Sequence, residues 1–135
     1  MDRVCHFEVP YSDKTRMEEF YGKVFGWQFM SAPGDMPYSF VITTEVDENF
    51  VPKNPGGVNG GSYPRGNEGE GGSSSPVIVI EVAGCQQRID EVVAAGGAKL
   101  LGPNEIPGMG IYAQVKDPEG NVISLWQPLN VPCDN

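Results

Sequence analysis

The sequence repeats one order of secondary-structure elements, strand–helix–strand–strand–strand, on either side of a polar, glycine-rich segment. Apolar residues that alternate predict strands, and apolar residues at helical spacing predict helices. The first half has predicted strands over Val4–Val9, Trp27–Met30, Tyr38–Thr44 and Gly57–Tyr63, and a helix from Lys14 that Gly26 ends. The second half has predicted strands over Val77–Val82, Ala98–Leu101, Ile111–Val115 and Val122–Trp126, and a helix over Cys85–Ala95. Two units of the same order can pair with pseudo-twofold symmetry and curve their strands around one shared cleft.

The last two predicted strands form an antiparallel hairpin. Both are apolar runs, and the segment Asp117–Asn121 between them, DPEGN, carries the residue types of a tight turn. A hairpin buries only one face well, so other parts of the chain must cover it.

The polar segment Pro64–Ser75 is the predicted boundary within a single domain. A chain of 135 residues is the length of one domain. Residues 1–63 form the first unit, 64–75 a flexible Gly/Ser-rich linker, 76–130 the second unit and 131–135 a tail. We therefore expect an α+β protein of two paired βαβββ modules with a curved mixed sheet. A ferredoxin-like split α/β sandwich is the alternative, but the additional final strand in each half argues against it.

The net charge and the cysteine content limit the possible binding partners and the cellular compartment of the protein. The formal net charge is −9, which disfavours binding to nucleic acid and to anionic membrane surfaces. No apolar run is long enough to span a membrane. The three cysteines have no metal-type spacing, and their odd number favours a reduced, cytoplasmic protein over a disulfide framework. Cys133, in the polar tail, is a candidate reactive thiol.

Several short motifs carry a resemblance to a known family. They are His6–Pro10, Phe20-Tyr21, Val24–Trp27, Asp117–Asn121 and Leu125-Trp126. In this combination, over Val4 to Pro128, the chain resembles the vicinal oxygen chelate superfamily, the group of glyoxalase I, bleomycin-resistance proteins and extradiol dioxygenases. The resemblance implies paired βαβββ modules around a cleft and a homodimer. It does not by itself imply a reaction.

The resemblance also implies where a metal would bind. In metal-dependent relatives the first and last strands of each module supply the ligands, typically two histidines and two glutamates. His6 falls on the first of these positions. Gly60 or its neighbour, Val77 and Ser124 fall on the other three, and none of these side chains is a histidine or a carboxylate. One imidazole does not hold a transition metal, so we expect no metal cofactor.

Seven residues are candidates for a ligand-binding site in the cleft. They are His6, Glu8, Tyr38, Glu81, Tyr112, Ser124 and Trp126. His6 and Glu8 share one strand face, and Glu81 has the place in the second unit that Glu8 has in the first. The two glutamates either form an acidic pair beside His6 or are solvated strand residues. His6 itself is a ligand contact, an acid–base group or a metal ligand. An acidic pair would favour a cationic or hydrogen-bond-donating ligand.

Two classes of function remain open. The first is a metal-free small-molecule binding module. The alternative is a metal-dependent lyase, isomerase or dioxygenase with a non-standard metal site of His6, Glu8 and Glu81. A third possibility is a protein that uses the fold as an interaction surface. A nucleophilic triad is improbable because the chain has one histidine and its neighbour Cys5 faces the opposite way.

Overall fold

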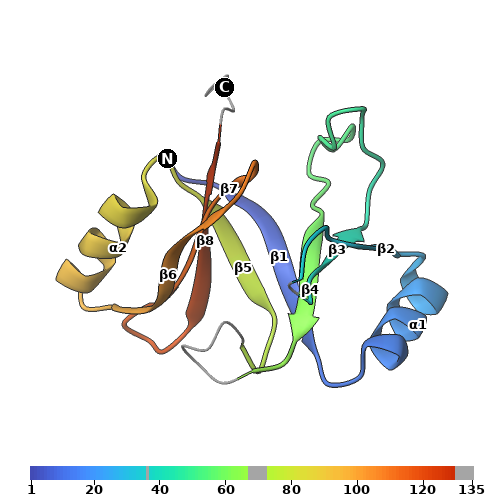
Figure 1. Ribbon diagram of the computed structural model, residues 1–135, viewed down its shortest axis with the longest axis horizontal. Helices are drawn as coiled ribbons and strands as arrows, with labels where there is room; N and C mark the ends of the chain where they lie inside the picture. The colour runs from blue at the N-terminus through green and yellow to red at the C-terminus, as the bar shows by residue number, and fades with distance from the viewer. Residues whose placement is uncertain (36, 67–72, 130–135) are drawn as a thin grey trace.

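The computed structural model describes residues 1–35, 37–66 and 73–129, and they form one α+β fold (Figure 1). The first half contains β1 (Val4–Tyr11), α1 (Lys14–Phe25), β2 (Gln28–Ser31), β3 (Ser39–Ile42) and β4 (Gly60–Pro64). The second half contains β5 (Val77–Glu81), α2 (Cys85–Ala94), β6 (Ala98–Ile106), β7 (Gly110–Lys116) and β8 (Val122–Pro128). The predicted fold class and the repeated order of elements are confirmed. The predicted boundary at 64–75 and the tail stay predictions, because residues 67–72 and 130–135 lie outside the described residues.

All strands belong to one mixed sheet, in the order β2-β3-β4-β1-β5-β8-β7-β6. β1 pairs in parallel with β4, and β5 pairs in parallel with β8. The halves meet where β1 pairs antiparallel with β5. Each half therefore has the same internal strand order, and the two are related about the β1–β5 pair. Figure 1 shows the sheet curving between two helices that lie at opposite ends of the molecule.

The second half contains the apolar core. Its helix α2 buries Cys85 and Ile89 against one face of the sheet. Gln127 of β8 accepts a hydrogen bond from the backbone N–H of Cys85 at 2.8 Å, which fixes the start of the helix on the sheet. The remaining buried members of this core are Val82, Ala113, Val115 and Leu125.

Helix α1 begins and ends where the sequence predicts. The Asp13 side chain accepts from the backbone N–H of Arg16 at 3.0 Å, and Gly26 adopts φ 74° at the C-terminal end. Its apolar residues recur at helical spacing, which predicts that the helix packs them on a sheet, and this prediction is largely wrong. No residue of α1 is buried, and Phe20, Val24 and Phe25 are 53%, 55% and 59% exposed.

Helix α1 contacts the rest of the fold largely through aromatic rings. Of the helix side chains, Tyr21 stacks on Trp27 with ring centroids 4.6 Å apart, and Trp27 in turn contacts Phe7 of β1. This aromatic column connects the helix to the sheet at one point. The described residues leave Phe20, Val24 and Phe25 largely uncovered.

The predicted hairpin is present as β7 and β8. The Asp117 side chain accepts from the backbone N–H groups of Glu119 and Asn121, and Gly120 has φ 85°, so the turn is closed locally. Strand β6 continues to Ile106, beyond the predicted end at Leu101. The dipeptide Gly102-Pro103 indicates a turn in sequence, but here it lies in an edge strand whose register shifts twice.

None of the helices in the described ranges has the length and apolar character needed to cross a membrane.

Candidate functional site

The register of the sheet places the seven candidate residues on one face, which we call the Glu8 face. It is the face opposite α2. Residues directly paired across a ladder share a face, and alternate residues along a strand return to it. His6 pairs with Val79, Val79 with Ser124, and Glu81 with Trp126. Tyr112 pairs with Trp126, and Tyr38 reaches the same face through its contact with Glu8.

Glu8 is the centre of a buried hydroxyl cluster. It lies on β1 and is 1% exposed. Its Oε1 accepts hydrogen bonds from Ser124 Oγ at 2.5 Å and from Tyr112 Oη at 3.0 Å. Its Oε2 accepts from Tyr38 Oη at 3.4 Å. The carboxyl group thus accepts a hydrogen bond from one hydroxyl of its own half and from two hydroxyls of the other half.

Burial and hydrogen bonding act on Glu8 in opposite directions. Removal from water raises the pKa of the Glu8 carboxyl, and the hydroxyls of Ser124, Tyr112 and Tyr38 lower it, with burial the larger effect. Burial, and then the nearby Glu8 carboxylate, also raise the pKa of Tyr38 and of Tyr112. These two phenols are therefore hydrogen-bond donors to Glu8 at neutral pH.

Gly61 makes room for one of these donors. A Cβ atom at Gly61 would overlap Tyr38 Oη and Cζ and would lie 2.7 Å from Tyr38 Cε1. Gly61 pairs directly with Glu8 across the β1–β4 ladder, so the missing side chain lets the Tyr38 ring lie over β4 and reach the carboxyl. The sequence pattern did not identify this role of Gly61.

Two further residues complete the cluster. Gln114 Nε2 donates to Tyr112 Oη at 2.9 Å, and the ring of Tyr63 stacks with that of Tyr38 at a centroid distance of 6.5 Å. Gln114 was missed by the sequence prediction. The signal was available, because Gln114 is a polar residue in the apolar strand Ile111–Val115 and alternates with Tyr112.

His6 and Glu81 lie on the same face but outside the cluster. His6 is exposed, and its Nδ1 is 2.9 Å from the carbonyl oxygen of Asn59. Because a carbonyl only accepts, Nδ1 carries the proton. Glu81 forms an ion pair with Arg3 at 2.8 Å. The structure therefore does not assemble Glu8 and Glu81 into an acidic pair beside His6. Trp126 lies over Gly110, where a Cβ atom would approach its ring to 2.7 Å.

The donor set does not fit a metal centre. In residues 1–35, 37–66 and 73–129, no group of three histidine, cysteine, aspartate or glutamate side chains comes together. Both oxygens of Glu8 are occupied by neutral hydroxyls, and Glu81 pairs with an arginine. The alternative set His6, Glu8 and Glu81 is thus dispersed, whereas Zn²⁺ or Fe²⁺ needs three or four converging donors.

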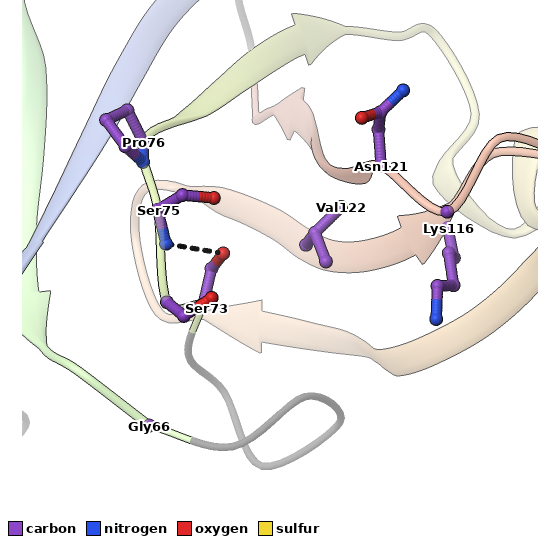
Figure 2. Close-up of a pocket in the computed structure, with 9 residues that line it drawn as sticks. Gly66, Ser73, Ser75, Pro76, Lys116, Asn121 and Val122 are labelled. Carbon is purple, nitrogen blue, oxygen red and sulfur yellow. Dashed lines mark hydrogen bonds between the residues drawn. The ribbon is translucent and has the colours of Figure 1, made fainter.

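A pocket of about 440 Å³ lies at one end of the Glu8 face. Figure 2 shows Ser73, Ser75 and Pro76 on one side of it, and Lys116, Asn121 and Val122 on the other. Val122 and Lys116 continue the Glu8 face, since each lies two residues along its strand from Ser124 or Gln114. The pocket wall is mainly polar, and Ser73 Oγ accepts from the backbone N–H of Ser75 at 3.3 Å.

Known structures share this fold at low sequence identity. Methylmalonyl-CoA epimerase from Streptomyces coelicolor, in complex with 2-nitronate-propionyl-CoA, has a TM-score of 0.62 at 14% identity; the match covers 95% of this chain and 98% of that one. A hypothetical protein from Bacillus halodurans has a TM-score of 0.60 at 13% identity, with 98% and 99% covered. A glyoxalase/bleomycin resistance protein/dioxygenase superfamily member from Vibrio splendidus has 0.57 at 17%, with 94% and 99% covered. No curated protein sequence matches the chain.

The sequence also matches a family model. The model describes the Glyoxalase/Bleomycin resistance protein/Dioxygenase superfamily, and it covers residues 3–125. This range contains every strand from β1 to β7 and both helices. Together with the paired βαβββ architecture, the match confirms the resemblance seen in the sequence motifs. The chain belongs to the Glyoxalase/Bleomycin resistance protein/Dioxygenase superfamily.

Proposed function

We propose that the protein is a metal-free small-molecule binding module whose ligand lies on the Glu8 face, in the pocket next to the hydroxyl cluster. The observation that carries this proposal is the hydrogen bonding of Glu8. Three hydroxyls occupy its two oxygens, and the side chain is 1% exposed. A carboxyl group held in this way fixes β1 relative to β7 and β8, the strands that carry the pocket residues Lys116 and Val122.

The same hydrogen bonds favour binding over catalysis by Glu8. A general base needs an oxygen within reach of the proton that it removes. Each oxygen of Glu8 instead faces a hydroxyl of Tyr38, Tyr112 or Ser124. A metal-dependent lyase, isomerase or dioxygenase would need donors that converge on one ion, and the cluster does not provide them.

The ligand that suits this site is neutral and polar. The expectation of a cationic ligand depended on an acidic pair, and Glu81 is neutralised by Arg3 while Glu8 is enclosed. The pocket wall offers hydroxyls, an amide and backbone groups from Ser73, Ser75 and Asn121. Such groups orient a small molecule through hydrogen bonds.

A ligand screen tests the proposal. Benzamide, benzylamine and benzoate serve as neutral, cationic and anionic probes, and thermal unfolding and NMR chemical shifts report binding. A probe at about ten times its Kd stabilises the folded state by about 1.4 kcal/mol. We expect benzamide to give the largest shift, with NMR changes at Val122 and Lys116 and none at Ile89 in the α2 core. If no probe raises the unfolding temperature, or if the shifts map to α2, the proposal is wrong.

We further propose that a second copy of the chain covers the exposed apolar surface. In addition to Phe20, Val24 and Phe25 on α1, Ile78 on β5 is 47% exposed on the sheet face that α2 covers elsewhere. Apolar groups of this size are a common feature of interfaces. Sedimentation velocity should show a homodimer, and Phe25→Asp should shift it to a monomer, with Lys99→Asp on the exposed end of β6 as the control. A wild-type monomer at micromolar concentration contradicts this proposal.

A further inference from the structure

We propose that Tyr63 and Gln114 form a subsite for a neutral group that carries both a hydrogen-bond donor and an acceptor, such as a carboxamide. The inference rests on the proposed function, since it specifies the chemistry that the site on the Glu8 face recognises. Both residues are buried, at 6% exposure for Tyr63 and 0% for Gln114. They come from β4 and β7, on the two sides of the Glu8 cluster.

The orientation of the Gln114 amide follows from counting protons. Tyr112 has one hydroxyl proton, which it donates to Glu8. The 2.9 Å bond between Gln114 and Tyr112 must therefore run from Nε2 to the phenol oxygen. The carboxamide oxygen of Gln114 consequently points away from Tyr112. It is buried and has no hydrogen-bond partner among the described residues.

The hydroxyl of Tyr63 is the matching unsatisfied donor. It is also buried without a hydrogen-bond partner in the described part of the chain. Burial raises the pKa of Tyr63 most, and the Glu8 carboxylate raises it further. The approach of the Gln114 side chain and of the Ser73 backbone to the hydroxyl lowers this pKa, although neither contact has the geometry of a hydrogen bond. Tyr63 is thus a protonated donor close to an unsatisfied acceptor. An unpaired buried donor and acceptor are costly, and a ligand that bonds both removes the cost.

The pocket adjoins this pair, although neither residue lines it. Ser73 lines the pocket, and its backbone is close enough to the Tyr63 hydroxyl to lower the pKa of Tyr63. On the opposite wall, Lys116 lies two residues from Gln114 on the same strand face. A ligand that extends from the pocket past Ser73 and Lys116 would reach the unsatisfied donor and acceptor.

The Tyr63–Gln114 pair itself favours a neutral group over a charged one. A carboxylate accepts from Tyr63 but has no donor for Gln114, and it would approach the Glu8 carboxylate in a site removed from water. An ammonium group donates to Gln114 but cannot accept from Tyr63. A primary carboxamide does both through its oxygen and its N–H.

Three probes of similar size separate these contributions. Benzamide has a donor and an acceptor, acetophenone has only an acceptor, and ethylbenzene has neither. Their Kd values are measured by NMR titration on the full chain and on Tyr63→Phe and Gln114→Met. Ser62→Ala is the matched control, because Ser62 also has a buried hydroxyl without a partner among the described residues but lies on the opposite face of β4.

We expect Tyr63→Phe to weaken benzamide binding about tenfold, which is the loss of one hydrogen bond between neutral groups. Gln114→Met should weaken benzamide but not acetophenone, and Ser62→Ala should change neither. Ethylbenzene should bind all variants alike. Without ligand, Tyr63→Phe should unfold at the same or a higher temperature than the wild type, because it removes an unpaired hydroxyl.

Other results overturn the subsite. If Tyr63→Phe lowers the unfolding temperature and leaves the benzamide Kd unchanged, the two side chains bond each other or one buried water. If ethylbenzene is lost together with benzamide, the substitution has collapsed the pocket and the subsite loses its support. If no probe binds the wild type, the binding function itself fails, whereas equal benzamide binding to wild type and Tyr63→Phe refutes the subsite alone.

Discussion

Replacing Gly61 by alanine should disrupt the Glu8 cluster from a position that makes no side-chain contact. The added methyl group would overlap Tyr38 Oη and Cζ, far inside van der Waals contact. The Tyr38 ring must therefore move, and it then loses its hydrogen bond to Glu8. Overpacking costs about 1–3 kcal/mol, and a hydrogen bond to a charged group is worth about 1.5–3 kcal/mol.

Two effects reduce the net cost. The bond from Tyr38 is long, at 3.4 Å, so it lies at the low end of that range. Alanine also restricts the unfolded chain, which returns about 0.4–1 kcal/mol. We expect Gly61→Ala to lower the free energy of unfolding by about 2–3 kcal/mol, measured by urea denaturation.

A double-mutant cycle tests the mechanism. In a Tyr38→Ala background the methyl group has room, so Gly61→Ala should cost less than about 0.5 kcal/mol or stabilise the protein slightly. Gly22→Ala is the control, because a Cβ atom there meets its nearest neighbour at 3.5 Å within helix α1. It should stabilise by up to about 1 kcal/mol. An equal cost of Gly61→Ala in both backgrounds would refute the steric argument.

Four further substitutions or treatments have defined outcomes. Burial holds the pKa of the Glu8 carboxyl above its usual 4.5, so the folded protein binds this proton more tightly than the unfolded chain does. The free energy of unfolding should therefore fall as the pH rises from 4.5 through the raised pKa. Glu8→Gln should remove that part of the slope in urea denaturation at several pH values, and an unchanged slope would contradict the assignment. Ile89→Ala in α2, where the side chain is 2% exposed, should cost about 2–5 kcal/mol. Phe20→Ala in α1 should cost about 0.5 kcal/mol in a monomer, and a large, concentration-dependent cost would instead favour the dimer. Burial raises the pKa of Cys5 to about 11 from 9.0. Alkylation of Cys5 at mildly alkaline pH should therefore be about a hundredfold slower in the native protein than in urea. Equal alkylation rates would show that the thiol is exposed.

The sequence predicted the order of elements well because strand and helix periodicities are local. The turn at Asp117–Asn121 and the helix stop at Gly26 are closed by neighbouring atoms, and both appear as expected. The interior of β6 was missed, since Gly102 and Pro103 are turn residues that an edge strand tolerates through shifts in register. The exposure of α1 was missed because periodicity shows which side of a helix is apolar, not whether another element covers it.

The candidate site was predictable only in part. All seven predicted residues lie on one face of the sheet, where alternation had placed His6 beside Glu8. The hydrogen bonds from Tyr38 and Tyr112 to Glu8 were not predicted. Alternation could not show that Glu81 turns to Arg3, because that contact depends on the path of the N-terminal residues. Nor could it show that a glycine determines the position of Tyr38, since the contact joins two strands through the sheet register.

The hydroxyl cluster also determines how the chain unfolds. Among the described residues, the halves meet in one strand pair, β1 with β5, and that ladder has an irregular register between Val4 and His6. Glu8 lies beside this seam and binds Tyr112 and Ser124 from the other half. Losing the cluster exposes a buried carboxyl on one side and two hydroxyls on the other, so opening one half removes buried hydrogen bonds from both. We therefore expect these hydrogen bonds, rather than the apolar core, which lies within the second half, to couple the unfolding of the two halves.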